Sequence, residues 1–275
     1  MTKPMIAAVL ALAACGTAKS GLPRAAPGDA VVEIRGAVKG GPFPLSERGL
    51  RALPQRAVHG VDPNSGREAS WEGVPLSVLV NDRVERKKGA DTVLVRTADK
   101  AAVPIPITLV RQLRPVLADR ADGARVPLVV AWPNLEQIGL GTDPRQPLWW
   151  AHDVVALEIV DFYATIGRAL GTPEGAPDGA RLGSDTFAAR CVACHALRGA
   201  GGQKGPDLTQ VATRLSSDAF RKLLESHPGW AQRGYDTPGP EAALDLWAFL
   251  RAVSMAPKPE PRPEGGRAAE SGALD

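Results

Sequence analysis

The stretch Cys191-Val192-Ala193-Cys194-His195 decides how the last third of the chain is interpreted. Two cysteines separated by two residues and followed directly by a histidine form the attachment signature of a c-type haem. The thiols can add across the two vinyl groups of the porphyrin, and the imidazole can reach the iron from the same segment. The sequence therefore predicts one covalent haem c, held by Cys191 and Cys194, with His195 as the proximal iron ligand.

Two other chemistries use the same cysteine spacing. A thioredoxin-like redox disulfide is expected next to a βαβ pattern, which this region lacks. A structural zinc site needs two further Cys or His ligands, and the remaining cysteine of the chain is Cys15. Covalent haem is favoured, because the histidine is fused to the cysteine pair and the partners that a disulfide or zinc site requires are missing.

The residues around the motif indicate a small helical domain. Ser184 is the predicted N-cap of a helix. Phe187, Cys191 and Cys194 recur at helical spacing, which places one ring and both thiols on one face. Two further helices are predicted, one through Ser226 with Ser216 or Ser217 as its cap and a final one over 241–253.

Gly205-Pro206-Asp207-Leu208 follows the motif, and residues 178–255 resemble the small bacterial c-type cytochromes. In that family the corresponding Gly-Pro-x-Leu segment lies beside the haem, and its proline carbonyl orients the proximal imidazole. The resemblance therefore implies that Pro206 fixes the tautomer and the ring plane of His195.

The sequence leaves the sixth iron ligand open. In the family that this region resembles, the ligand is usually a methionine before the last helix, but residues 228–240 contain none. His227 is the candidate distal ligand, because it continues the apolar stripe of the preceding helix; the alternative is a histidine at the helix C-terminus, favoured there by the helix dipole. Met255, which is expected to face away from the iron, Tyr235 and a five-coordinate iron complete the range of possibilities.

Residues 1–15 have the features of an export signal. A lysine precedes an apolar run over 5–14 that is too short to span a bilayer. Leu12-Ala13-Ala14-Cys15 resembles the lipobox of bacterial lipoproteins, which implies a lipid on Cys15; an ordinary cleaved signal is the alternative. Both place the chain outside the cytoplasm, and we expect it on the periplasmic side of a bacterial membrane, with 16–29 as a tether.

Residues 30–165 are predicted to form an α+β domain with a mixed β-sheet and short helices. Short β-branched runs alternate there with turn signals and brief helical stretches. Strands are expected at 30–35, 56–61, 92–97, 103–107, 126–131 and 154–160, and short helices before Pro54, after Pro75 and over 109–113.

Length and charge set the remaining limits. A chain of 275 residues suits two modest domains, and we expect a linker over 166–179, an all-α domain over 180–256 and a disordered tail over 257–275. The net charge of +3 is small and the basic residues are scattered, so no nucleic-acid partner is expected. Redox proteins of the cell envelope are the expected partners.

Trp71-Glu72-Gly73-Val74-Pro75-Leu76, the run 126–130 and the closing Trp149-Trp150 lie in an order that resembles the oxidoreductase molybdopterin-binding domain of the sulfite oxidase class. The resemblance implies a domain in which a cysteine thiolate binds molybdenum. Residues 30–165 contain no cysteine, so such a centre cannot be assembled as in the family. We expect a cofactor-free docking or ligand-binding module; a molybdenum cofactor held without cysteine is the alternative.

The other conspicuous side chains of this domain are interpreted as structural. His59 and His152 are expected to contact solvent or to make local hydrogen bonds. Of Trp149 and Trp150, one ring is expected to be buried and the other to lie at the rim. Asp99 is expected to be a solvated loop charge.

The leading hypothesis is an exported monohaem c-type cytochrome that transfers single electrons, with the first domain as a docking or ligand-binding module. A second hypothesis is an enzyme, a molybdopterin-dependent oxidoreductase like the sulfite dehydrogenases, that passes electrons to its own haem. A third is a haem-based sensor that binds a small ligand at an open iron. Electron transfer is favoured over catalysis, and the sequence leaves the question open.

Overall fold

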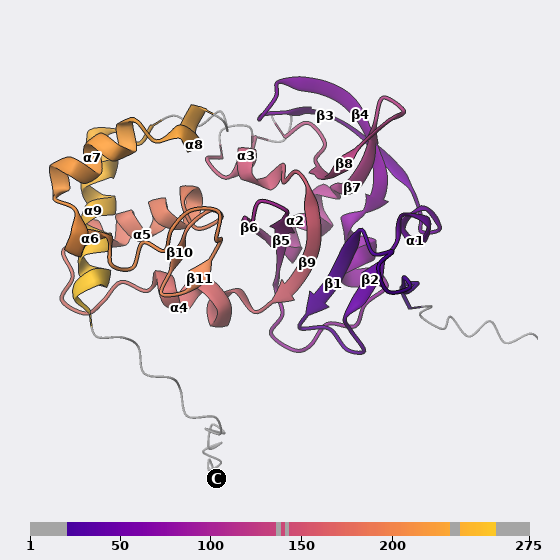
Figure 1. Ribbon diagram of the computed structural model, residues 1–275, viewed down its shortest axis with the longest axis horizontal. Helices are drawn as coiled ribbons and strands as arrows, with labels where there is room; N and C mark the ends of the chain where they lie inside the picture. The colour runs from indigo at the N-terminus through magenta and orange to yellow at the C-terminus, as the bar shows by residue number, and fades with distance from the viewer. Residues whose placement is uncertain (1–20, 136–138, 141–142, 232–236, 257–275) are drawn as a thin grey trace, which may run out of the picture.

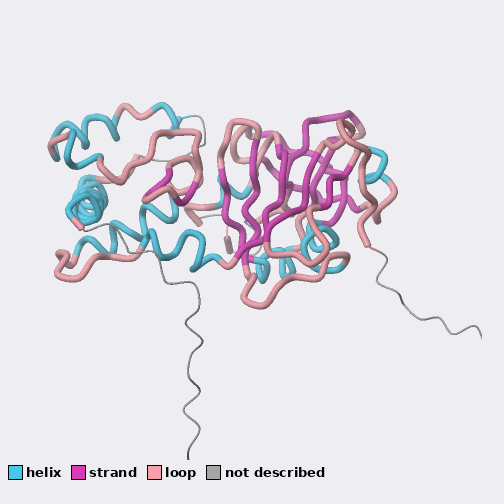
Figure 2. The backbone as a smooth tube through the Cα atoms, turned by 60° about the horizontal axis from the view of Figure 1, so that its bottom comes forward, coloured by secondary structure: helices cyan, strands magenta, loops and turns pink. Residues whose placement is uncertain are grey.

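A computed structural model of the chain describes residues 21–135, 139–140, 143–231 and 237–256 (Figure 1). The predicted signal with Cys15, the candidate Tyr235 and the tail over 257–275 lie outside the described residues. A β-rich N-terminal part and a helical C-terminal part lie side by side (Figures 1 and 2). Among the described helices, none combines the length and the apolar character needed to cross a membrane.

The N-terminal part contains two sheets, a five-stranded one in the order β2-β1-β9-β5-β6 and a four-stranded one in the order β3-β4-β7-β8. Only β1 and β9 pair in parallel among the named strands, so the first sheet is mixed and the second antiparallel. This confirms the predicted α+β class. The strands are β1 (Val32–Gly36), β2 (Phe43–Leu45), β3 (Arg56–Asp62), β4 (Arg67–Pro75), β5 (Thr92–Thr97), β6 (Ala102–Pro106), β7 (Val116–Ala121), β8 (Ala124–Ala131) and β9 (Val154–Val160).

Burial along the strands explains how they are placed. The strand β3 alternates between exposed and buried positions, as expected when one face of a strand meets water. The strand β5 is buried through its first four residues, because it lies inside its sheet between β9 and β6. The short helices are α1 (Glu47–Arg51), α2 (Ile107–Leu113), α3 (Gln146–Trp149) and the π-helical turns Val78–Asp82 and Tyr163–Gly167.

The prediction that only one of the rings of Trp149 and Trp150 is buried is wrong, because each residue is only 2% exposed. Trp149 ends the helix α3 instead of entering a strand, and its carbonyl oxygen accepts a hydrogen bond of 2.8 Å from Trp132 Nε1. The Trp150 ring packs edge-on against Trp71, with ring centroids 5.4 Å apart. Two further buried indoles therefore cover both rings.

The C-terminal part consists of helices around one apolar interior, which confirms the predicted all-α class. The helices α5 and α9 cross closely at Gly183, where a Cβ atom would lie only 2.0 Å from the Asp245 carbonyl oxygen. Its helices are α5 (Gly179–Arg190), α6 (Val211–Arg214), α7 (Ser217–Glu225), α8 (Pro228–Ala231) and α9 (Pro240–Met255), preceded by α4 (Arg168–Leu170), and two short strands, β10 (Ala196–Leu197) and β11 (Ala200–Gly201), form a small hairpin.

Two predicted helix ends in this part differ from the structure. Ser184 is not an N-cap, because α5 already begins at Gly179 and the Ser184 hydroxyl donates a 2.6 Å hydrogen bond to the Leu170 carbonyl oxygen. The last helix continues past Val253 and ends at Met255. The cap predicted at Ser216 is confirmed, since its hydroxyl oxygen accepts a hydrogen bond from the Ala219 amide at the start of α7.

Candidate functional site

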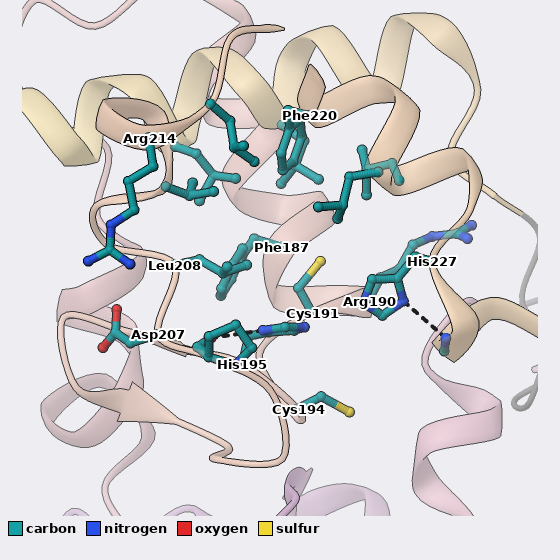
Figure 3. Close-up of a pocket in the computed structure, with 18 residues that line it drawn as sticks. Phe187, Arg190, Cys191, Cys194, His195, Asp207, Leu208, Arg214, Phe220 and His227 are labelled. Atoms are coloured by element: carbon teal, nitrogen blue, oxygen red, sulfur yellow. Dashed lines mark hydrogen bonds between the residues drawn. The ribbon is translucent and has the colours of Figure 1, made fainter. Parts of the chain in front are cut away.

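A cavity of about 410 Å³ lies within the helical part, between α5, α7, α9 and the loop that follows α5 (Figure 3). Its walls are largely apolar, and a concave apolar cavity with a few convergent polar groups is the usual form of a cofactor site. Cys191, Cys194, His195 and His227 all line it. The structure thus brings together the four side chains for which the sequence predicts a role in holding haem; the apolar lining includes Phe187, Leu208, Phe220, Leu224, Leu246 and Leu250.

The ring of His195 is fixed by the segment that follows it. Its Nδ1 lies 2.9 Å from the Pro206 carbonyl oxygen, and a carbonyl can only accept, so Nδ1 carries the proton. In the neutral imidazole, Nε2 then keeps its lone pair. Gly205 packs against the ring so closely that a Cβ atom there would lie 2.2 Å from His195 Cε1. The segment therefore sets both the tautomer and the plane of the imidazole.

The two cysteines lie on a short turn that continues α5. The Cys194 and His195 amides both donate to the Cys191 carbonyl oxygen, over 3.0 and 2.9 Å. Figure 3 shows the Cys191 sulfur atom above the His195 imidazole and the Cys194 sulfur atom below it. Burial, with a smaller effect of Cys194, raises the pKa of Cys191 to about 12, so this side chain is a neutral thiol.

His227 faces His195 across the cavity, with ring centroids 5.9 Å apart and ring planes inclined by 61°. Its Nδ1 accepts a hydrogen bond of 3.0 Å from the Gly229 amide, which is drawn in Figure 3. Burial lowers the pKa of His227, and the neighbouring His195 adds to the shift, so the ring favours the neutral form. Met255 lies outside this cavity at the end of α9 and is 73% exposed.

Sequence reasoning missed two arginines that line the same cavity, Arg190 and Arg214. Guanidinium groups suit planar carboxylates, which are the polar substituents of haem. Arg190 ends α5 directly before the motif and Arg214 ends α6. The signal that would have found them is a basic residue at a helix end directly before the Cys-x-x-Cys-His motif, and another at a helix end shortly after the Gly-Pro-x-Leu segment.

In the N-terminal part, His59 makes a local pair with Glu68 at 3.0 Å, whereas His152 lies 3.1 Å from the buried Asp62, which is distant in the sequence. Asp99 lies exposed in the turn after β5, as predicted for a solvated loop charge, and its carboxylate also lies 2.6 Å from Lys204 Nζ in the helical part. Within the described residues, no group of three or more Cys, His, Asp or Glu side chains is arranged to hold a metal ion.

Fold and site together define the C-terminal part as a helical domain built around a Cys-x-x-Cys-His segment. Residues 180–253 match the family of cytochrome c and form a cytochrome c domain, which implies a haem c and supports electron transfer. No curated protein matches the chain. Among solved structures, the sulfane dehydrogenase SoxCD from Paracoccus pantotrophus is similar, at 18% identity and a TM-score of 0.38. The match covers 51% of this chain and 40% of that chain, so this chain spans less than half of its length.

Proposed function

We propose that the protein is an exported monohaem c-type cytochrome that carries single electrons, with its N-terminal domain as a docking or ligand-binding module. The observation that supports this best is the convergence of Cys191, Cys194 and His195 on one apolar cavity. These residues fit a covalent haem, because two thiols, one imidazole with its Nδ1 proton directed to Pro206 and apolar walls are the groups that such a site requires.

When bound, haem c supplies a one-electron couple at its iron. Cys191 and Cys194 would hold it through thioether bonds, in which each sulfur bonds one vinyl carbon and the thiol hydrogen goes to the other. His195 would present Nε2 to the iron. Its Nδ1 proton donates to the Pro206 carbonyl, which orients the ring and makes it a stronger donor. The apolar walls exclude water and so influence the reduction potential.

For the sixth position we propose His227. Its ring lines the same cavity as His195, with the two ring centroids 5.9 Å apart, so it could hold the iron of a bound haem together with His195. Because Nδ1 of His227 accepts from the Gly229 amide, the neutral ring carries its proton on Nε2. Binding through Nε2 would therefore require the proton to move to Nδ1 and the Gly229 bond to break. His227 would accordingly be a weak, displaceable ligand.

The same hydrogen bond favours a second candidate function, a haem-based small-ligand binder. A His227 ring that keeps its proton on Nε2 presents a hydrogen-bond donor to the cavity instead of a metal ligand. The ferrous protein would then bind carbon monoxide rapidly, with a shift of the Soret band. If His227 is the ligand, binding is slow, and His227→Ala accelerates it. Fast binding that this variant leaves unchanged contradicts the ligand role.

The experiment that tests the main proposal is pigment retention in a host that matures c-type cytochromes. The purified chain is expected to be coloured, to keep its colour in acidic acetone and to show a one-electron redox spectrum. A variant with Cys191→Ala and Cys194→Ala is expected to lose the pigment on extraction. Colourless protein, or pigment that acidic acetone removes from the wild type, contradicts the proposal.

We further propose that Cys15 carries a lipid and anchors the chain to a bacterial membrane on its periplasmic side, where redox proteins of the cell envelope are its partners. The support is the lipobox-like ending at Cys15. Wild-type protein is expected in the membrane fraction and Cys15→Ala in the soluble periplasm. Metal analysis tests the proposal that the first domain, which contains no cysteine, works without molybdenum: iron without molybdenum supports it, and one molybdenum per chain contradicts it.

A further inference from the structure

A turn of the N-terminal domain contacts the haem-attachment segment directly. This turn, residues 97–101, joins β5 to β6. Just after it, the Ala102 amide donates a hydrogen bond of 2.8 Å to the carbonyl oxygen of Ala193, which lies between the two cysteines. The Gln203 amide in turn donates a hydrogen bond of 2.9 Å to the Lys100 carbonyl oxygen. Both ends of the segment 193–203, which includes His195, are therefore bonded to one edge of the first domain.

The next residue after Gln203, Lys204, forms an ion pair with the same turn of the first domain. Lys204 Nζ lies 2.6 Å from Asp99 Oδ2. Burial alone would raise the pKa of Asp99, but hydrogen bonds from Lys204, Thr97 and the Ala101 amide outweigh it and hold the pKa below its usual value. The carboxylate is therefore ionised, and the buried Thr97 anchors it to the end of β5.

The residues that follow Lys204 are those that fix the imidazole. Gly205 packs against the His195 ring, and the Pro206 carbonyl oxygen accepts the Nδ1 proton. The Gly205 amide also donates a hydrogen bond of 2.8 Å to the Cys194 carbonyl oxygen. Only Gly205 lies between Lys204 and Pro206, and this hydrogen bond and the contact with the His195 ring hold Gly205 in place. A displacement of Lys204 would therefore be transmitted to Pro206.

We propose that the turn 97–101 is a positioning element of the haem site, in which Asp99 acts through Lys204 to hold the Pro206 carbonyl against His195. The first domain would thereby set the reduction potential of the haem as well as serve as a docking module. The inference rests on the proposed function, since it requires a haem bound to His195. A firm hydrogen bond to Nδ1 makes the imidazole a stronger donor and stabilises ferric iron, whereas a loosened bond raises the potential.

The test is the midpoint potential of the full-length haem protein with both Asp99→Asn and Lys204→Gln. The double variant loses one negative and one positive charge, so the net charge is unchanged and a loosened Pro206 contact is the main expected cause of a shift. An exposed ion pair accounts for at most about a fivefold change in an equilibrium. We therefore expect an upward shift of up to about 40 mV, which is that fivefold change for a one-electron couple.

Two further variants separate positioning from other effects. The exchanged pair, Asp99→Lys with Lys204→Asp, restores the attraction and is expected to return the potential toward the wild-type value. The control is Arg221→Gln with Glu225→Gln, which removes an ion pair of 3.0 Å on α7 at no change in net charge and is expected to leave the potential unchanged. Amide hydrogen exchange at Gln203 is expected to accelerate in the Asp99/Lys204 double variant only.

An unchanged potential in the Asp99/Lys204 double variant, with haem attached, overturns the positioning role and leaves the proposed function intact. A downward shift, or an equal upward shift in the α7 control, overturns it as well. Absence of covalent haem from the wild-type protein is a different outcome, because it contradicts the proposed function itself.

Discussion

Replacing Gly205 by alanine tests the packing of the proximal imidazole. The new Cβ atom would lie 2.2 Å from His195 Cε1, 2.6 Å from Nδ1 and 2.8 Å from Nε2, whereas carbon atoms in contact prefer about 3.5–4.0 Å. The Gly205 backbone is held by its hydrogen bond to the Cys194 carbonyl, so the ring is the part that moves. It must retreat by roughly 1.3 Å to restore normal contact.

A displacement of this size is enough to break the bond to Pro206. The distance from His195 Nδ1 to the carbonyl oxygen is now 2.9 Å, and polar atoms separated by about 3.6 Å no longer form a hydrogen bond. Loss of such a partner typically weakens metal binding by about 10–100-fold, which corresponds to about 1.4–2.7 kcal/mol. Both thioether bonds are expected to form in the Gly205→Ala variant, with His195 held more weakly on the iron.

The assay is denaturant titration of the ferric haem protein, followed by the visible spectrum, which reports when the axial histidine leaves the iron. The control is Gly21→Ala, because a Cβ atom at Gly21 meets no atom within 4 Å. The free energy of this transition is expected to stay within about 0.5 kcal/mol of the wild-type value in the control. If Gly205→Ala binds haem covalently and loses its axial ligand at the wild-type midpoint, the argument from close packing is refuted.

Three other changes have outcomes that follow from single contacts. Gly183→Ala places a Cβ atom 2.0 Å from the Asp245 carbonyl oxygen. The cost of overpacking, about 1–3 kcal/mol, should exceed the gain in helix propensity of about 1 kcal/mol, so the variant should be less stable. An unchanged thermal midpoint would contradict this. Ser216→Ala removes the cap of α7 and should lower stability to denaturant by about 0.5–2 kcal/mol, whereas Ser216→Asp should retain it. Burial alone would raise the pKa of Asp62, but hydrogen bonds led by that of His152 hold it below 3.8. Its carboxylate therefore stabilises the fold above that pH and ceases to do so as the pH falls through the lower folded-state value; acid titration of Asp62→Asn should show a shallower loss of stability, and an identical acid profile would count against this role.

The sequence predicts best where the deciding chemistry is local. The bounds predicted for β5 and β9 match the structure because each is dominated by β-branched and apolar residues, with a single charged residue in each. The pattern does not indicate β4 as a strand, since Arg67–Pro75 mixes charges, glycine and tryptophan. It is a strand because β3 and β7 pair with it on both sides, and pairing between distant segments leaves little trace in the pattern of one of them.

The same distinction holds at the site. His195 and Pro206 are only 11 residues apart, so a short motif can specify both, and the predicted hydrogen-bond geometry is present. The cap predicted at Ser184 is wrong because the partner of its side chain, Leu170, belongs to the preceding helix. The partner of Asp99 lies 105 residues further along the chain, and a surface aspartate carries no sign of a contact at that distance.

The ion pair between Asp99 and Lys204 also illustrates how a contact can matter for function and little for stability. The side chains are 48% and 37% exposed, and exposed pairs of this kind contribute about 0–1 kcal/mol. The backbone hydrogen bond from the Ala102 amide to the Ala193 carbonyl oxygen involves neither side chain, so the domains should stay joined when the pair is removed, even though the Gln203 amide exchanges faster. A positioning role therefore requires a change in reduction potential without a change in the unfolding midpoint. Separation of the two domains would instead lower the unfolding midpoint and would also reduce the protection of the Ala102 amide from hydrogen exchange.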